Sequence, residues 1–137
     1  MNIFVDTGAF YALADASDTR HDSAKIFYAA AIREHRFFTT NFVLVESWLL
    51  IRNKLGYPTA QKFFDGIRRG IVKIVDVSSS DLDQAWQILF DYGDQEFSLV
   101  DAASFAVMER LGTSTAFSFD AHFRVYRREK KSFALVP

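Results

Sequence analysis

Apolar residues along this chain follow two alternating patterns, and the alternation predicts the fold class. Five short runs are almost continuously apolar, which is typical of strands that are buried on both faces. These runs lie at residues 2–5, 37–40, 71–77, 115–119 and 133–136. The segments between most of them place apolar residues at helical spacing. Short apolar strands alternating with helices indicate an α/β domain with a mainly parallel sheet in three layers, α/β/α.

Capping and helix-ending residues set the expected bounds of the helices. We expect helices at residues 9–14, 23–34, 42–55, 58–69, 80–90 and 97–111, and a short helix or loop from residue 121. Asn41 is the expected N-cap of the third helix, Gly56 ends it, and Pro58 opens the next. Ser80 or Asp81 is the expected cap of the helix that follows the third strand.

Composition limits the class of protein. A chain of 137 residues with 50% apolar residues and fifteen phenylalanines is expected to form one domain, residues 1–137, around an aromatic core. The net charge of −1 offers no global attraction for a polyanion, so a nucleic acid would need a local basic patch or a metal. There is no cysteine, no signal-like start and no membrane-length apolar run. We therefore expect a cytoplasmic protein that does not contact a membrane.

Four carboxylates stand in otherwise apolar or small-residue surroundings: Asp6, Glu46, Asp101 and Asp120. A charged carboxylate seldom lies on a buried face unless it is paired, hydrogen-bonded or bound to a metal. Asp6 and Asp120 follow predicted strands, at the sheet edge where open α/β folds bind ligands. Each could equally serve as the N-cap of the helix that follows, and a capping aspartate can also be a ligand.

Glu46 and Asp101 lie on predicted helices. The neighbours of Glu46 at helical spacing are all apolar, namely Phe42, Val43, Leu49 and Leu50. The alternative for Glu46 is the exposed margin of its helix, paired with an arginine. Asp101 lies in a first helical turn, where the helix dipole alone favours a negative charge. Asp94, one loop upstream, could cap that helix or join the site.

Clustered carboxylates predict a bound cation, because without one they repel each other. Hard oxygen ligands select Mg²⁺ or Mn²⁺, and such ions promote hydrolysis of phosphodiesters. His21, His35 and His122 are not expected to be ligands, since none has a partner at helical ligand spacing. His122 is expected just past the site, where it would at most contact substrate. No phosphate-cradling glycine motif is present.

Four stretches of the chain, taken in order, are similar to one known family. DTGAFYAL, TTNFVLVESWLLI, DQEFSLVDAASFAVM and TAFSFDAHF resemble PIN-domain nucleases, and among them the VapC-type toxins of prokaryotic toxin–antitoxin pairs. The resemblance spans residues 2–136. It implies that Asp6, Glu46, Asp101 and Asp120 are the catalytic acids, with Asp6, Asp101 and Asp120 as metal ligands. It also implies accessory roles near the metal for three further residues, Thr7, Asp94 and Ser98.

The resemblance implies an activity and partners as well. It predicts an endoribonuclease that depends on Mg²⁺ or Mn²⁺, a homodimer, a five-stranded parallel sheet, and a cognate antitoxin whose tail enters the site. Two other interpretations stay open: a non-catalytic binding module, and a DNA-directed or RNA-maturation nuclease on the same scaffold.

Basic residues are candidates for RNA contacts. They cluster at Arg68 and Arg69 and in the segment RVYRREKK, which contains Arg124, Arg127, Arg128, Lys130 and Lys131. Tyr126 lies within this segment and could stack on a base. A solvated surface run explains each of these residues equally well.

Overall fold

The fold is that of a computed structural model, which describes residues 1–128 and 131–137, with the backbone alone at 127 and 128. The elements, in chain order, are β1 (Asn2–Val5), α1 (Thr7–Ala14), α2 (His21–Ala31), β2 (Arg36–Thr40), α3 (Asn41–Leu55), α4 (Tyr57–Arg68), β3 (Val72–Val75), α5 (Ser79–Asp91), α6 (Leu99–Leu111), β4 (Thr115–Phe117), α7 (His122–Val125), β5 (Arg127–Arg128), β6 (Lys131–Ser132) and β7 (Ala134–Val136). Within the described ranges, no helix is long and apolar enough to cross a membrane.

The central sheet has five strands in the order β3-β2-β1-β4-β7, and every neighbouring pair is parallel. This confirms the predicted sheet. The chain builds outward from β1 through β2 to β3, and then returns to place β4 on the other side of β1. The order therefore reverses between β1 and β4, and their carboxyl ends form the switch point where open α/β sheets bind ligands.

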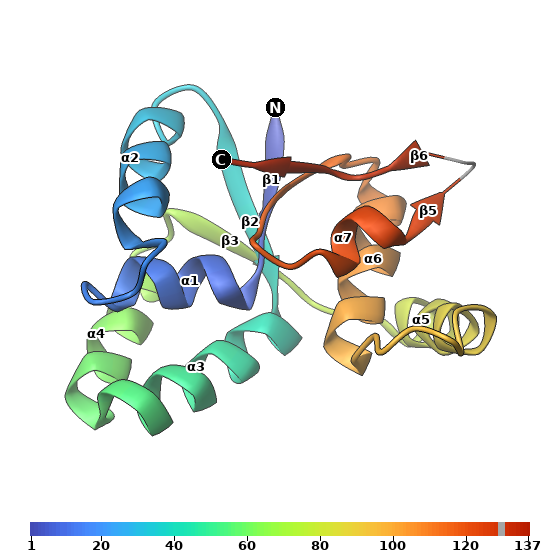
Figure 1. Ribbon diagram of the computed structural model, residues 1–137, viewed down its shortest axis with the longest axis horizontal. Helices are drawn as coiled ribbons and strands as arrows, with labels where there is room; N and C mark the ends of the chain where they lie inside the picture. Colours follow the sequence, from blue (N-terminus) through green and yellow to red (C-terminus); the bar gives the residue numbers. More distant parts are fainter. Residues whose placement is uncertain (129–130) are drawn as a thin grey trace.

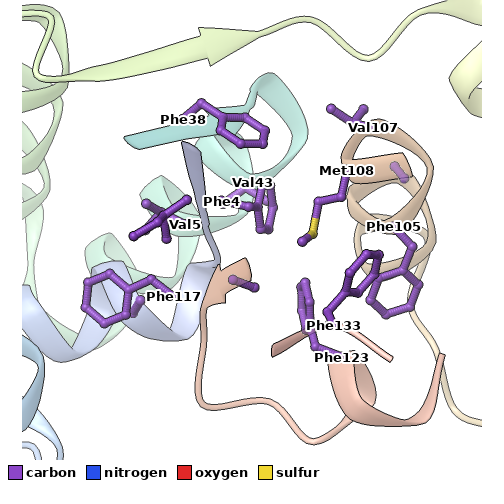
Figure 2. Packing of buried hydrophobic residues seen from close by; sticks show 14 of the residues in the cluster. Phe4, Val5, Phe38, Val43, Phe105, Val107, Met108, Phe117, Phe123 and Phe133 are labelled. Carbon is purple, nitrogen blue, oxygen red and sulfur yellow. The ribbon is translucent and has the colours of Figure 1, made fainter. Parts of the chain in front are cut away.

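Helices cover both faces of the sheet, as the continuous apolar strands predict. Figure 1 shows α1 and α2 on one side of the strands and α5, α6 and α7 on the other. Phe4 of β1 packs on Phe123 of α7, with ring centroids 5.9 Å apart, and Phe123 packs on Phe105 of α6 at 4.9 Å. On the opposite face, Phe117 of β4 meets Phe27 of α2 at 4.9 Å. Figure 2 shows Phe4, Phe105, Phe117, Phe123 and Met108 in the packed interior.

Several predicted boundaries are corrected by hydrogen bonds. The N-cap of α3 is Thr40, whose Oγ1 accepts from the Val43 amide at 3.1 Å. The Asn41 side chain instead accepts from the Val77 amide at 2.9 Å, which ties the segment after β3 to the start of α3. The cap of α5 is Ser78, upstream of the expected position. The short antiparallel pair β5–β6 was not predicted.

Candidate active site

A pocket of about 450 Å³ lies at the carboxyl edge of the sheet, beside the β1–β4 switch point. It is lined by Asp6, Thr7, Gly8, Arg20, Glu46, Glu96, Ser98, Asp101, Phe119, Asp120 and His122. The four predicted carboxylates and two of the predicted accessory residues, Thr7 and Ser98, therefore come together here. The third, Asp94, is exposed and outside this lining, and Glu96 takes the place expected for it.

Asp6 is the most buried of the four acids, with 5% of its surface exposed. Its amide donates to the Phe117 carbonyl at 3.1 Å, which joins the ends of β1 and β4. Its side chain makes no capping hydrogen bond to α1, and Oδ2 instead accepts from the Ser118 hydroxyl at 3.0 Å. Burial, reinforced by the negative charges of Asp101 and Asp120, raises the pKa of Asp6 to about 7, against hydrogen bonds from Thr7 and Ser118 that lower it.

Asp101 both caps a helix and faces the pocket. It is the third residue of α6, and its Oδ2 accepts from the Ser98 amide at 3.1 Å while the Ser98 hydroxyl accepts from the Asp101 amide at 3.0 Å. This reciprocal capping box holds the carboxylate in place. The same Oδ2 lies 2.9 Å from Nδ1 of His122. Capping and site roles therefore coexist in one residue.

Asp120 and His122 complete the arrangement. Asp120 Oδ1 accepts from the His122 amide at 2.9 Å and lies 3.5 Å from the His122 ring nitrogen Nδ1. Ligand atoms of Asp101, Asp120 and His122 all lie within 4.8 Å of one another. Burial disfavours the charged imidazole, but the hydrogen bond that the ring donates to Asp101 and the negative charges of Asp120, Asp101 and Glu96 outweigh it, so the pKa of His122 is raised. The expectation that His122 would lie just past the site is wrong, because the ring faces two of its carboxylates.

Glu46 reaches the pocket from α3. Its Oε1 accepts from the Thr7 hydroxyl at 2.5 Å, which links α3 to the first residue of α1. Glu46 is half-buried, and no ion pair joins it to an arginine in the part of the chain that the structure describes. The alternative of an arginine-paired residue at the helix margin is therefore not what the structure shows.

Several residues of the site were missed from the sequence, namely Glu96, Phe119 and Arg20, which line the pocket, and the buried Ser118. Ser118, 3% exposed, donates to Asp6 and accepts from the Asp120 amide at 3.0 Å, so one hydroxyl orders both segments. Arg20 lies in the α1–α2 loop, with its guanidinium carbon 5.1 Å from the centre of the Phe119 ring. A serine after a strand and an arginine in a polar loop carry no distinctive pattern, so no local signal marked either one.

Of the basic residues predicted to contact RNA, those whose side chains the structure describes lie outside the pocket lining. Arg124 is exposed on α7 but outside the pocket lining, and Arg68 lies at the end of α4 with Arg69 directly after it. The side chains of Arg127 and Arg128, and Lys130 as a whole, lie outside the described residues. Tyr126 is 6% exposed and stacks on Phe105 at 4.7 Å, so the prediction that it stacks on a base is corrected.

The donors present fit a hard divalent cation. Asp6, Asp101 and Asp120 supply carboxylate oxygens, the ligand type that Mg²⁺ and Mn²⁺ prefer. The burial of Asp6 beside two further acids is unfavourable for its ionised form, and a cation would relieve it. The compact group of ligand atoms contains His122 alongside Asp101 and Asp120, and Asp6 is not part of that group. An imidazole nitrogen is compatible with Mn²⁺ and less typical of Mg²⁺.

A parallel α/β sheet with carboxylates from β1, α3, α6 and the β4–α7 connection at its switch point is the architecture of a PIN domain, and the chain belongs to the PIN domain family, which matches residues 3–129. It is 39% identical to the 23S rRNA-specific endonuclease VapC20 of Mycobacterium tuberculosis over 122 residues, which is 88% of this chain and 91% of the relative. It is 23% identical to Ribonuclease VapC26 of the same organism over 126 residues, 91% of this chain and 92% of that protein.

Solved structures show the same fold. The crystal structure of Mycobacterium tuberculosis VapC20, described as a sarcin–ricin loop cleaving toxin, superposes with a TM-score of 0.85 at 33% identity, covering 95% of this chain and 98% of that one. The structure of VapBC2 from Rickettsia felis, bound to promoter DNA, has a TM-score of 0.71 at 14% identity and covers 98% and 97%. At this low identity, the similarity to VapBC2 shows a shared fold only.

Proposed function

We propose that this protein is a divalent-metal-dependent endoribonuclease and the toxin of a toxin–antitoxin pair. One observation carries the proposal: three aspartates from separate segments, two of them at least nine-tenths buried, line one pocket at the switch point of the sheet. Acids in such a place are costly unless a cation is bound between them. The similarity to VapC20, which is named a 23S rRNA-specific endonuclease, supports RNA as the substrate and 23S rRNA as the first one to test.

In the proposed mechanism Asp6, Asp101 and Asp120 hold Mg²⁺ or Mn²⁺, with His122 beside them. When bound, the ion supplies charge neutralisation at the phosphodiester and makes water more acidic. Ser118 orients Asp6, and Ser98 orients Asp101. Such outer hydrogen bonds keep carboxylates in a productive position.

Glu46 has a separate role in this proposal. It lies outside the three proposed metal ligands, and the Thr7 hydroxyl holds one of its carboxylate oxygens. We assign Glu46 to accept or hold a proton within the pocket during hydrolysis. A positioned carboxylate of this kind contributes about 10²- to 10⁴-fold to a proton transfer.

The first test is RNA cleavage by Asp6→Asn and Asp101→Asn. Each substitution keeps the shape of the side chain and removes its charge, so we expect at least about 100-fold less cleavage of 23S rRNA in Mg²⁺ or Mn²⁺, with an unchanged circular dichroism spectrum. Asp83→Asn is the matched control, since Asp83 is an exposed aspartate on α5 outside the pocket. Full activity in both site variants would rule out the site assignment.

Growth on expression separates an enzyme from a binding module. If the protein is a nuclease toxin, expression arrests growth and Asp6→Asn relieves the arrest. If toxicity survives that substitution, the acids are structural and a partner-binding role is favoured. Sequencing the RNA ends that form after a short induction distinguishes ribosomal RNA cleavage from RNA maturation.

Partners are also part of the proposal. We infer a cognate antitoxin protein that blocks the pocket, supported by the description of VapC20 as a toxin. We infer a homodimer from the family resemblance. Light scattering on the purified chain tests the dimer, and co-expression with the product of the neighbouring gene tests the antitoxin by whether growth recovers.

A further inference from the structure

The carboxylate pocket contains one guanidinium. Within the described part of the chain, five acids line the pocket and Arg20 is the only arginine or lysine among its lining residues. A nucleic acid that approaches this pocket meets concentrated negative charge, and the chain as a whole carries a net charge of −1. A positively charged side chain beside the acids therefore contributes most to the binding of a polyanionic strand.

The loop that carries Arg20 is held by its own hydrogen bonds. Asp15 accepts from the Tyr11 hydroxyl at 2.6 Å and from the Ser17 amide at 2.9 Å. The Arg20 amide donates to Asp18 Oδ1 at 2.8 Å, and His21 Nδ1 lies 2.7 Å from the Ala12 carbonyl. The backbone at Arg20 is therefore fixed relative to α1, which begins at the pocket.

The Arg20 side chain lies over an aromatic ring and forms no ion pair with a carboxylate of the described residues. Its guanidinium carbon is 5.1 Å from the Phe119 ring centre, and Phe119 in turn packs on the buried Phe117 at 6.2 Å. No ion pair within 4.0 Å joins Arg20 to an acid of the described residues, although acids line the same pocket. A guanidinium held over an aromatic face keeps its in-plane donors free for an incoming anion.

We propose that Arg20, held by Phe119, is a phosphate-binding subsite that positions the RNA strand beside the proposed metal centre. The inference rests on the proposed ribonuclease function and names a residue that selects and orients its substrate. The guanidinium would donate to non-bridging oxygens of a phosphate that flanks the scissile one, and Asp6, Asp101 and Asp120 would hold the cation that neutralises charge during cleavage. Arg20 is a positioning residue in this scheme, and it does not take part in bond cleavage.

Binding is measured in a Glu46→Gln background, which keeps all three proposed metal ligands while slowing cleavage. The probe is a fluorescein-labelled hairpin of the 23S rRNA sarcin–ricin loop, titrated in Mg²⁺ at several salt concentrations. We expect Arg20→Ala to raise Kd about tenfold and to lower the slope of log K against log salt by about 0.7 to 0.9, the value for one lost phosphate contact. Arg20→Lys retains the charge, so it keeps the slope and recovers only part of the affinity.

Cleavage kinetics and two further variants complete the test. With Glu46 intact, Arg20→Ala should raise KM about tenfold and leave kcat within about twofold. Phe119→Leu removes the ring that holds the guanidinium, which can then turn toward the acids, so we expect weaker RNA binding. Because both variants remove the same contact, the double variant with Arg20→Ala should have nearly the same Kd as Arg20→Ala alone. Arg33→Ala is the matched control, an exposed arginine near the amino edge of β2 and outside the pocket lining. It should change neither Kd nor slope.

The outcomes separate this inference from the function on which it rests. If the wild type cleaves RNA but Arg20→Ala keeps the wild-type Kd and salt slope, the subsite is wrong. A fall in kcat with unchanged Kd also overturns it, because Arg20 would then act in the reaction. If the wild type neither binds nor cleaves the RNA, the proposed function fails first.

Discussion

At the scale of single residues, one buried hydroxyl controls the geometry of two acids. Ser118 donates to the Asp6 carboxylate and accepts from the Asp120 amide, both at 3.0 Å. A hydroxyl can do both at once because it carries one donor and two acceptor lone pairs. Removing it leaves a buried carboxylate without its donor and frees the segment that carries Asp120.

We therefore predict that Ser118→Ala lowers kcat for RNA cleavage by about 10- to 100-fold and destabilises the fold by about 1–3 kcal/mol. Steady-state kinetics and urea unfolding measure the two effects. Ser114→Ala is the control, since Ser114 is exposed and lies before the same strand. Wild-type kcat in Ser118→Ala would show that the serine does not order the acids.

Thr7 orients Glu46 through a single hydrogen bond of 2.5 Å. Thr7→Val has nearly the same shape but no hydroxyl, so we expect kcat to fall about tenfold or more while stability changes little. Thr7→Ser keeps the donor and should retain most of the activity. Equal activity in the valine and serine variants would contradict the assigned role.

At the scale of elements, one ion pair joins the end of α6 to the start of α5. Arg110, in the last turn of α6, donates to both carboxylate oxygens of Asp81, at 2.8 and 2.9 Å. Asp81 is 3% exposed and also closes the capping box with Ser78 at the start of α5. The hydrogen bond from Arg110 outweighs the effect of burial and, with the Ser78 bonds, lowers the pKa of Asp81.

The lowered pKa predicts a pH-dependent contribution to stability. Because the folded-state pKa lies below the unfolded value of about 3.9, the contribution is complete above that pH and is lost as pH falls through the folded-state pKa. We expect Asp81→Asn to reduce the free energy of unfolding by about 1–2 kcal/mol at neutral pH, a modest value because the Arg110 side chain is 43% exposed. The difference from wild type should shrink below about pH 4.

Urea unfolding at several pH values measures this effect. Asp83→Asn serves as control, since Asp83 is exposed on the same helix and has no such partner among the ion pairs of the described residues. If the difference in the free energy of unfolding between Asp81→Asn and wild type stays constant as the pH falls below about 4, the ionised Asp81 carboxylate does not stabilise the fold.

At the scale of the whole molecule, the acids come from segments far apart in the chain. Asp6 follows β1, Glu46 lies on α3, Asp101 on α6 and Asp120 after β4. An unfolded chain does not hold them together, so a cation binds the folded state alone and stabilises it. The same pocket therefore couples metal binding to the stability of the complete sheet.

We predict that Mn²⁺ raises Tm and that a chelator reverses the rise. The stabilisation reaches about 2.7 kcal/mol at a free concentration of one hundred times Kd. Asp120→Asn should lose most of this shift, and Asp83→Asn should keep it. Differential scanning calorimetry measures the shift, and an equal rise in wild type and Asp120→Asn would place the cation elsewhere.

The sequence by itself determined the strands of the central sheet, the layers and the edge where the acids collect. These follow from the spacing of apolar residues and from the position of Asp6 and Asp120 after strands, both of which are local properties. Glu46 was predicted as a site residue from its apolar neighbours at helical spacing, and Asp101 chiefly from the family resemblance. Cap positions shifted by one to three residues because several neighbouring polar side chains can each cap a helix start, as Thr40 and Asn41 could at α3.

Only the tertiary structure decided how the pocket is completed. His122 meets Asp101 across twenty-one residues of sequence, Arg20 enters from a loop, and Asp94 stays outside. Tyr126 turns inward onto Phe105 and away from any RNA. The direction of a loop side chain depends on the elements packed around it, and no pattern within its own segment records that packing.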